Sequence, residues 1–528
     1  DKASMPRLLM ETGMAYRAVG NFTEAGIAYE KALKMWRQEG NLFWQSTLLN
    51  NLGVFYHFQG EYEKSALTFE EGLVCARRSR YARLDGLISI GLGDLYAELE
   101  DVEMAGRNYQ HASGVLKDMD DRFLHHFLAL ARANLALLQK DVFLAREIAQ
   151  DVADAILSGG SNYENGLLSL VYGRAYLLEG KFRQAIVSLE NAEKCFVEDG
   201  RNNETAVAHV WLAAACWQEG NRDRAAQLMN EIRANPGKDI HAMLVAVHQA
   251  RDWLDGLGTM PGLERAARDL FVQANRLSIK MPSTRRQLRR QAQVVSSPSP
   301  HLTIQAFGHA VVSIGGKPLT SSDWQTQSVR DLFFFLLSAK KPLTKEQIGE
   351  ALWSDMYEAS KLKLRFKNEV YRLRRAVGQD VVIFQDNHYT FNRHLDYEYD
   401  VEAFEAFLSR AKSTNTPAEQ MDFYQKAVDF VRGPYLDDVY ADWAVYDRER
   451  LGQAYLNGLV SLADLYKQHA QYEKAVTTAQ QAIAHDPGCE SAYRTAMEAH
   501  HRLGDRVSVT RVYKACHSAV QDLFNLPP

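Results

Sequence analysis

Residues 361–375 read Lys-Leu-Lys-Leu-Arg-Phe-Lys-Asn-Glu-Val-Tyr-Arg-Leu-Arg-Arg, with seven basic residues against a single acid, Glu369. The apolar residues recur every three or four positions, so in a helix they share one face. They are Leu362, Phe366, Val370, Leu373 and Val377. This pattern predicts a helix that packs one stripe against a core and exposes a cationic surface elsewhere.

The other sides of this helix differ in what they present. Directly opposite the stripe lie Lys361, Leu364, Asn368, Tyr371 and Arg375. The two flanks carry Lys363, Lys367 and Arg374 on one side and Arg365 and Arg372 on the other. Such a helix suits the DNA major groove, because its outer face can meet base edges while its flanks meet phosphates. An isolated run of charges is more often a solvated surface, so the flanking sequence has to decide.

The flanking segments have the pattern of a winged helix. Residues 302–308 and 310–314 read as short strands, and Gly315-Gly316 makes a hairpin turn after them. Two helices are predicted over residues 327–338 and 344–353, the second with Thr344 as its N-cap. After the basic helix, closed by Gly378, residues 381–384 and 389–391 flank a turn at Asp386-Asn387. Strands, three helices and a final hairpin predict a winged helix.

These residues resemble the OmpR-type winged helix of SARP-type bacterial transcriptional activators. The matching motifs are Leu302-x-Ile-x-x-Phe-Gly308, Gly316-Lys-Pro-Leu319, Leu343-x-x-x-x-Ile348-x-x-x-Leu352-Trp353, Val370-x-x-Leu373-Arg-Arg-Ala-Val-Gly378, Tyr389 and Phe391. Further on, the residues that resemble the bacterial transcriptional activator domain of that family are Arg432-Gly-Pro-Tyr-Leu436, Trp443 and Arg448-x-Arg450-Leu451. The resemblance covers residues 302–528 and departs at residues 354–360, which lack the usual proline-rich character. It implies a DNA-binding activator.

The first half of the chain repeats every forty residues. The repeated small and aromatic positions are Gly13, Gly53, Gly93, Ala133, Gly173 and Ala213, then Tyr16, Tyr56, Tyr96, Ala136, Tyr176 and Cys216. We expect small residues where two helices approach and an aromatic residue one turn later to fill the gap, with turns at Gly20, Gly60, Gly180 and Gly220. This predicts a tetratricopeptide-like superhelix over residues 1–280, capped by an irregular unit from about residue 239. It resembles the arm of MalT-type regulators, which implies that a nucleotide-binding domain could precede Asp1.

Two further segments complete the predicted organisation. Residues 281–300 are basic, with Arg285, Arg286, Arg289 and Arg290, and then rich in Ser and Pro, which predicts a linker with little burial. Its arginines fit either phosphate contacts or a solvated hinge. Residues 301–395 form the winged-helix domain and residues 396–528 the activator domain, where a thirty-four-residue repeat predicts two short helical hairpins. The predicted fold class is therefore mainly α: an α-solenoid, an α+β winged helix and a second short tetratricopeptide-like domain.

Composition adds further limits. The net charge of −5 is unevenly distributed, because residues 301–395 hold thirteen basic and nine acidic residues and residues 396–528 hold thirteen and twenty. The positive field is thus local to the winged helix. Five scattered cysteines predict buried thiols rather than disulfides or a zinc site. No apolar run approaches the roughly 20 residues that span a bilayer. No catalytic motif is found, since residues 308–317 fit a hairpin better than a phosphate loop; no enzyme activity, cofactor or metal is predicted.

These features together predict a cytoplasmic, nucleoid-associated bacterial regulator of transcription, an activator, that binds double-stranded promoter DNA. Phosphate contacts are expected from Lys363, Arg365, Lys367, Arg372 and Arg374. Base contacts are expected from Lys361, Asn368, Tyr371 and Arg375. The array would take a small-molecule or protein effector in its concave groove, RNA polymerase is an expected partner, and a homodimer is left open. The alternative is a scaffold whose winged helix binds protein, such as RNA polymerase, rather than DNA.

Overall fold

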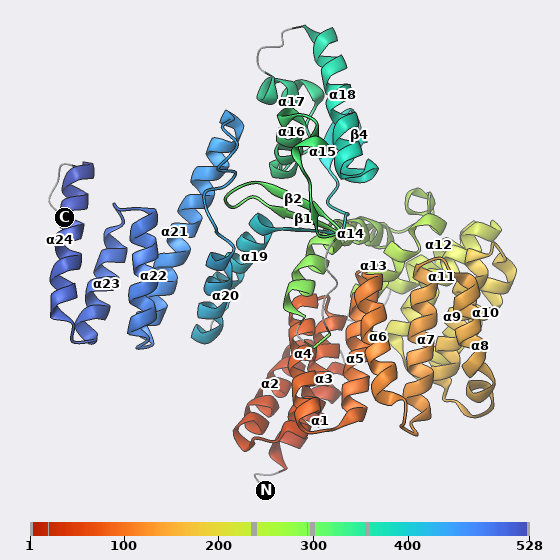
Figure 1. Ribbon diagram of the computed structural model, residues 1–528. Coiled ribbons are helices and arrows are strands. Elements are labelled where there is room, and N and C mark those ends of the chain that lie inside the picture. Colours follow the sequence, from red (N-terminus) through yellow and green to blue (C-terminus); the bar gives the residue numbers. More distant parts are fainter. Residues whose placement is uncertain are drawn as a thin grey trace. The chain divides into compact units, whose positions relative to one another are not determined.

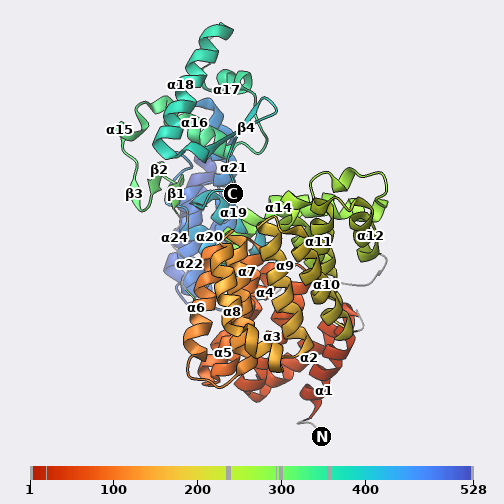
Figure 2. The same cartoon turned by 90° about the vertical axis from the view of Figure 1, so that its right-hand side faces the viewer.

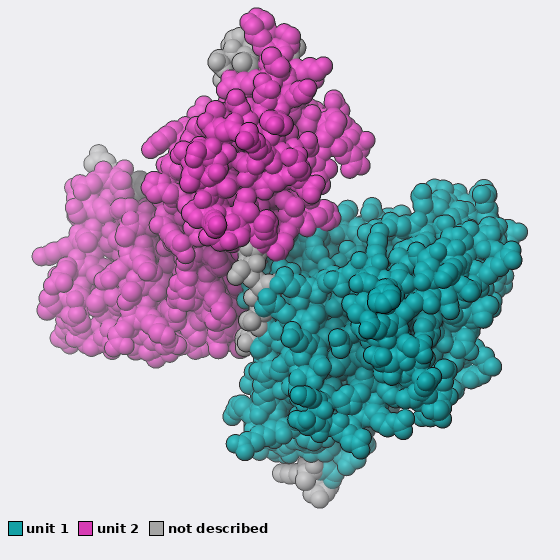
Figure 3. Space-filling model, turned by 45° about the vertical axis from the view of Figure 1, so that its right-hand side comes forward, with its two compact units in different colours: residues 1–298 teal, residues 299–528 magenta. Residues whose placement is uncertain are grey.

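Helices make up most of the structure, and among the residues that it describes, strands occur only in the second half of the chain. The computed structural model describes residues 4–18, 21–233, 240–292, 294–295, 301–353, 358–414 and 416–524. The chain divides into two compact units, residues 1–298 and residues 299–528, which Figure 3 colours separately. The mainly α-helical fold expected from the sequence is confirmed.

The first unit is a stack of helical hairpins (Figures 1 and 2). Successive helices are joined by short turns and pair in order, which confirms the predicted tetratricopeptide-like solenoid. The helices are α1 (Met5–Ala18), α2 (Phe22–Glu39), α3 (Leu42–Phe58), α4 (Tyr62–Arg78), α5 (Ala82–Glu98), α6 (Val102–Leu116), α7 (Arg122–Leu138), α8 (Val142–Gly159), α9 (Asn162–Leu178), α10 (Phe182–Glu198), α11 (Asn202–Glu219) and α12 (Arg222–Arg233).

The repeated small residues mark the closest approach within each hairpin. A Cβ atom at Gly53 would lie 2.5 Å from the Phe69 ring, and one at Gly93 would lie 2.3 Å from the Tyr109 ring. The ring over each glycine therefore comes from the second helix of the hairpin. The expectation that the aromatic one turn later fills this gap is wrong, and Tyr16 is even partly exposed.

The turns inside the hairpins also repeat at the forty-residue period. Gly60, Gly180 and Gly220 have positive φ angles of 71°, 71° and 93°. Glu100 and Lys140 occupy the same position with φ of 58° and 62°, so the turn keeps its left-handed backbone even where glycine is absent. Gly20, the first expected turn glycine, lies outside the described residues.

The array ends in α13 (Ile240–Gln249), two 3-10 turns, η1 (Arg251–Trp253) and η2 (Leu257–Thr259), and α14 (Arg265–Gln291). Helix α14 crosses the upper ends of the array helices in both views (Figures 1 and 2). Residues 281–292 belong to this helix, and Met281, Pro282, Arg286 and Leu288 are buried. The prediction of a poorly packed linker is therefore wrong for residues 281–292, because these arginines find carboxylate and carbonyl partners in the array. Residues 296–300 lie outside the described part of the chain.

The second unit begins with the winged helix. Its elements are β1 (Leu302–Gln305), β2 (Val311–Ile314), β3 (Lys317–Pro318), α15 (Ser321–Trp324), α16 (Gln327–Ser338), α17 (Lys345–Leu352), α18 (Ala359–Val377), η3 (Gln379–Val381), β4 (Val382–Gln385), β5 (His388–Phe391) and β6 (Tyr397–Tyr399). The four-stranded sheet has the order β3-β2-β1-β6, and β4 and β5 form a separate hairpin. Strands β1 and β2 pair antiparallel from Leu302 opposite Ile314 to Gln305 opposite Val311.

Strand β6 connects the two segments that the sequence predicts as separate domains, residues 301–395 and 396–528. It pairs in parallel with β1, with Ile304 opposite Tyr399. The predicted boundary at residues 395/396 thus falls just before a strand of the winged-helix sheet. A single hydrophobic core runs from Leu302 of β1 to Ala499, so residues 301–395 and 396–528 fold as one compact unit.

The rest of this unit is helical. Its elements are α19 (Asp400–Ser413), α20 (Pro417–Asp429), η4 (Asp442–Ala444), α21 (Val445–Gln468), α22 (Tyr472–His485), α23 (Glu490–Arg502) and α24 (Arg506–Phe524). Helices α21 to α24 form the two short hairpins that the thirty-four-residue repeat predicts. Among the described residues, no helix is both long and apolar enough to cross a membrane. All five cysteines are free, and only Cys489 is not fully buried.

Candidate nucleic-acid interface

Helix α18 is fixed to the winged-helix core by the predicted apolar stripe. Phe366, Val370 and Leu373 are buried. The Phe366 ring meets the Trp353 ring edge to face at 6.3 Å between centroids, and it meets Tyr389 of β5 at 4.6 Å. Gly378 follows the last turn with a φ of 145°, so the helix ends where the sequence predicts. The stripe determines which side of α18 faces solvent.

The opposite side of α18 is open. Lys363, Lys367, Asn368, Tyr371 and Arg375 are exposed, with Tyr371 at 65%. No hydrogen bond or ion pair within the described residues engages these five side chains. Lys361 is also exposed but pairs with Glu358 at 2.8 Å, one turn earlier. The structure therefore brings five of the nine predicted site residues together as an exposed polar and cationic surface, which we call the α18 outer face.

Three of the predicted basic residues make contacts within the fold. The Arg365 guanidinium lies over the Trp353 ring, 4.9 Å from its centroid. Arg372 pairs with Glu369 at 3.5 Å, and Arg374 donates a hydrogen bond of 3.0 Å from Nη2 to the backbone oxygen of Val382 at the start of β4. All three are half-buried. Arg365 and Arg374 hold the helix against its neighbours and Arg372 pairs within α18, so less of each guanidinium is available to a ligand than the sequence suggests.

Glu369 has a structural role that the sequence analysis missed. Its side chain is buried, 5% exposed, and accepts a hydrogen bond from Thr326 Oγ1 at 3.5 Å in addition to the Arg372 pair. Thr326 is the N-cap of α16. The signal was present in the spacing, because Glu369 lies three residues after Phe366 and four before Leu373 and so shares their face. Glu369, the single acid among the basic residues of this helix, therefore belongs to the face that packs on the core.

The wing is fastened at its base. Tyr389 of β5 exchanges two backbone hydrogen bonds with Leu343, the residue just before the N-cap of α17, at 2.7 and 3.0 Å. Asp386 and Asn387 turn the hairpin with φ of 50° and 61°, as the sequence predicts. Phe384 at the end of β4 remains 53% exposed beside this turn. The wing thus projects from the same body as α18 and carries an exposed aromatic residue.

Behind the wing and α18, two sequence motifs pair with each other. The Gly308 amide donates to the Pro434 oxygen at 2.9 Å, and the Leu436 amide donates to the Ala306 oxygen at 2.7 Å. A Cβ atom at Gly433 would lie 3.1 Å from the Gly308 Cα, so a larger residue there would press on the Gly308 backbone. The opening motif of the winged helix and the Arg432–Leu436 motif of the activator segment therefore form one joint.

Charged side chains reinforce this joint. Asp400 accepts hydrogen bonds from the Ala306 and Phe307 amides at 2.8 to 3.0 Å, and burial raises the pKa of its carboxyl to about 6. Arg448 donates to the backbone oxygens of Tyr435, Leu436 and Val439 at 2.7 to 2.9 Å. The motif residue Arg448 thus shapes the loop that meets the winged helix and is not part of the α18 outer face.

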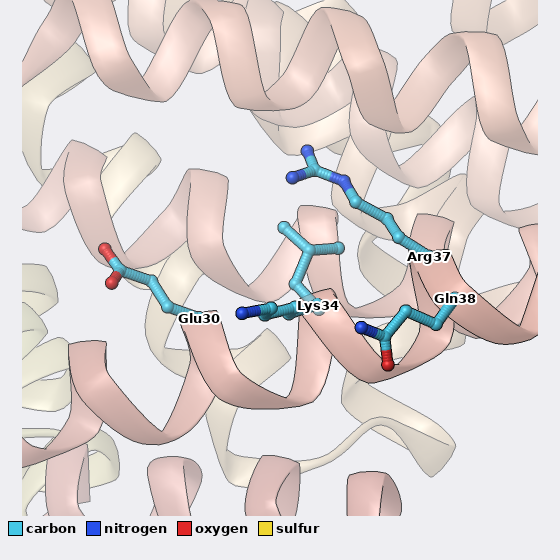
Figure 4. A pocket seen from close by; sticks show the side chains of 5 residues that line it. Glu30, Lys34, Arg37 and Gln38 are labelled. Atoms are coloured by element: carbon cyan, nitrogen blue, oxygen red, sulfur yellow. The ribbon is translucent and has the colours of Figure 1, made fainter. Parts of the chain in front are cut away.

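The array offers shallow hollows as candidate effector sites. One of about 460 Å³ lies along α2 and is lined by Glu30, Leu33, Lys34, Arg37 and Gln38 (Figure 4). All five residues come from a single helix, so the hollow has no opposing wall of its own. Arg37 is also engaged by Glu71 at 2.6 Å. This hollow gives a small molecule little enclosure.

Two segments of the chain match models of known protein families. Residues 399–528 match the family model of the bacterial transcriptional activator domain, and residues 4–78 match a tetratricopeptide repeat model. Residues 399–528 thus contain a bacterial transcriptional activator domain, and the tetratricopeptide repeat match covers the first two hairpins of the array. No curated protein matches the chain.

Several solved structures are similar to parts of the chain. Mycobacterium tuberculosis EmbR, solved in complex with a low-affinity phosphopeptide, is 16% identical over 44% of this chain and 62% of its own, with a TM-score of 0.38. A tetratricopeptide repeat protein from Parabacteroides merdae is 14% identical over 52% of this chain and 99% of its own, with a TM-score of 0.30. The apo quorum sensor NprR of B. thuringiensis is 10% identical over 81% of this chain and 94% of its own, with a TM-score of 0.24. The chain thus spans less than two thirds of EmbR.

Proposed function

We propose that this chain is a bacterial transcriptional regulator, an activator, that binds promoter DNA through α18 and the β4–β5 wing. The observation that carries this proposal is the α18 outer face, where Lys363, Lys367 and Arg375 have no partner within the described residues while the opposite stripe is clamped in the core. The presence of an activator domain in the same compact unit supports it. The protein would act in the bacterial cytoplasm, at the nucleoid.

The side chains of α18 would make two kinds of contact with DNA. Lys363 and Lys367 would hold backbone phosphates, assisted by the exposed parts of Arg365, Arg372 and Arg374. Asn368, Tyr371 and Arg375 would meet base edges, because they lie opposite the buried stripe, and Lys361 would join them once it leaves Glu358. The wing would lie along the neighbouring backbone or minor groove.

The test is a charge reversal on the α18 outer face. Lys363→Glu together with Lys367→Glu should abolish binding to duplex DNA, because it turns two phosphate contacts into repulsion. Binding would first be measured on mixed-sequence duplex at low salt and then on fragments selected from genomic DNA. The matched control is Lys340→Glu with Lys341→Glu, which makes the same charge change at two exposed lysines after α16. Equal retention by both double variants would exclude α18 as the docking helix.

A second candidate function is supported by the exposed apolar side chains around α18. Leu364 is 63% exposed and Phe384 53% exposed, and such groups suit a protein surface such as RNA polymerase. The two functions differ in their dependence on salt. DNA affinity should fall steeply between about 50 and 200 mM salt. A protein interface that is mainly apolar should change little over the same range.

The tetratricopeptide array would receive the signal as an effector or partner. A signal can change DNA affinity only if it binds two states of the chain unequally. The chain and its second unit alone, residues 299–528, would be compared on the same promoter. If the array restrains DNA binding, residues 299–528 alone should bind DNA more tightly than the whole chain. If the array supplies dimerisation, they should bind more weakly. Identical DNA binding and transcription by the two would show that the array has no regulatory role.

A further inference from the structure

Four carboxylates of the second and third repeats lie under the C-terminal half of α14. They are Glu63 and Glu70 of α4, and Glu100 and Asp101 at the turn between α5 and α6. We call these four residues the acidic cradle. Asp101 is only 1% exposed and Glu70 only 6%. Buried carboxylates need hydrogen-bonding or charged partners, and residues 285–294 supply partners for Glu63, Glu70 and Asp101.

The contacts between the segment and the acidic cradle are specific. Arg289 forms a two-pronged pair with Asp101, with Nε and Nη2 each 2.6 Å from a carboxylate oxygen. Arg285 donates to the Glu100 backbone oxygen at 3.0 Å, and Gln287 donates to Glu63 at 2.8 Å. The Val294 amide donates to Glu70 at 3.0 Å. Three cradle carboxylates therefore have a partner from this one segment, whereas Glu100 meets it through its backbone oxygen and pairs its carboxylate with His248 at 3.1 Å.

Apolar side chains complete the same contact. Met281 and Leu288, seven residues apart, are buried in a core that also contains Phe69 and Leu73 of α4. On the other edge of the segment, Arg289 reaches the Asp101 carboxylate and Arg285 reaches the Glu100 backbone oxygen. An amphipathic helix that lays an apolar edge and a charged edge into a complementary surface is a common mode of peptide recognition. The last part of α14 is bound in the way that a separate peptide would be.

Pro282 divides α14 into two parts. Proline has no amide hydrogen, so the helix lacks one backbone hydrogen bond at this position. Before it, Ala267, Leu270 and Ala274 pack in the core formed by the last repeats, which includes α12 and α13 residues. After it, the segment is held mainly by the acidic cradle. The two parts thus have separate binding partners, and the weak point of the helix lies between them.

We propose that the acidic cradle is a binding site for an arginine-bearing amphipathic helix, that residues 281–294 are the ligand it holds here, and that this segment leaves when a helix of the same chemistry takes its place. Release exposes the acidic cradle to the competitor. It also frees residues 281–292 from the array. Occupancy of the site therefore decides whether this helical segment stays packed on the first unit.

The covalent link explains how the site would stay closed at rest. A tethered segment acts at an effective concentration in the millimolar range, so a free peptide at micromolar concentration competes poorly with it. Weakening the resident segment should therefore open the site to a peptide of the same sequence. This effect separates a true binding site from a helix that is simply part of the fold.

The experiment uses the whole chain and a fluorescent peptide of residues 281–295. Arg285→Glu with Arg289→Glu should release the segment, so that amides of residues 283–292 exchange hydrogen faster while those of residues 266–280 stay protected. This variant should bind the wild-type peptide at least about tenfold more tightly than the unaltered chain does. The control, Arg276→Glu, changes an exposed arginine on the same helix before Pro282 and should leave both measurements unchanged.

Asp101→Asn locates the peptide. It keeps the side-chain oxygen that caps α6 by accepting the Met104 amide at 3.2 Å, and it removes the charge that Arg289 meets. Added to the released variant, it should cut peptide affinity about tenfold or more. The proposal is overturned if the released variant does not bind the peptide, or if Asp101→Asn leaves binding unchanged. Neither measurement involves DNA, so the outcome is independent of the proposed function.

Discussion

The ring of Phe366 in α18 meets the ring of Tyr389 in β5 edge to face, with 4.6 Å between their centroids. This contact joins the cationic helix to the wing. Tyr389 also exchanges backbone hydrogen bonds with Leu343, just before α17. Helix, wing and the entry to α17 are thereby held in one geometry. The proposed match of this surface to duplex DNA would need this kind of rigid support.

Phe366→Ala should destabilise the second unit by about 3 to 5 kcal/mol, because it removes a buried ring and leaves a cavity between α18, Trp353 and the wing. Urea unfolding followed by tryptophan fluorescence would measure the loss. Leu364→Ala is the matched control, since Leu364 lies on the same helix but is 63% exposed, and it should change stability by less than about 0.5 kcal/mol. Similar losses for the two variants would contradict the observed orientation of α18.

Asn368→Ala or Arg375→Ala should each weaken binding to a selected DNA site by about 1 to 3 kcal/mol and affect random duplex much less. Lys363→Ala should instead weaken both nearly equally and lower the slope of log affinity against log salt by about one. Titrations on a selected and a scrambled duplex separate these outcomes. If Asn368→Ala behaves like Lys363→Ala, then Asn368 contacts the backbone.

Gly433→Ala should destabilise the joint between the winged helix and the activator domain by about 1 to 3 kcal/mol, because its Cβ would lie 3.1 Å from the Gly308 Cα. Gly452→Ala is the control, since a Cβ there meets nothing closer than 3.6 Å inside helix α21. It should stabilise the chain by about 0.5 to 1 kcal/mol. Thermal unfolding of the two variants should therefore shift in opposite directions.

The stability of the second unit should depend on pH through Asp400. Burial raises the pKa of this carboxyl to about 6, whereas an aspartate in an unfolded chain titrates near about 4. Between these values the folded chain holds the proton more firmly, so its stability falls as the pH rises from about 4 to about 6. Wild type should lose about 1 to 3 kcal/mol across this window relative to Asp400→Asn, which does not titrate. A constant difference between the two chains would contradict the raised pKa.

Trypsin should spare Arg285, Arg286, Arg289 and Arg290 in the folded chain, because they lie in a packed helix that the acidic cradle holds. A solvated basic linker would be cut there first. Mass spectrometry of the early fragments gives the order of cleavage. Early cleavage after Arg289 in the unaltered chain would show that the segment is free most of the time.

The sequence predicts the elements whose signals are local. The bounds of α16, the N-cap Thr344, the buried stripe of α18 and the Asp386-Asn387 turn were all visible, because each depends on periodicity or turn chemistry within a few residues. The repeat period of forty residues likewise predicted the solenoid. The α18 outer face could be listed because the stripe determines what lies opposite to it.

The features that were missed depend on partners distant in sequence. Strand β6 is three residues long and forms only because β1 offers a free edge. Residues 281–292 look like a linker until Asp101 and Glu100, some 185 residues earlier, supply their partners. Arg374 looks like its neighbours in composition, and only the fold directs it to the Val382 oxygen. Composition therefore overestimated the number of free cations on α18.

The shared core of the second unit also bears on how such proteins can be recombined. The Phe307 ring packs on Phe404 at 5.2 Å between centroids, and the two rings lie on opposite sides of residue 399, where the match to the activator domain begins. A gene fusion that separates the chain at this position would leave an exposed apolar face on each product. A domain taken from another protein would have to supply both a glycine opposite Gly308 and an aromatic ring that packs on Phe307. Winged helix and activator segment should therefore be inherited together, and a chimaera designed to change the proposed DNA preference should exchange side chains on α18 rather than the whole winged helix.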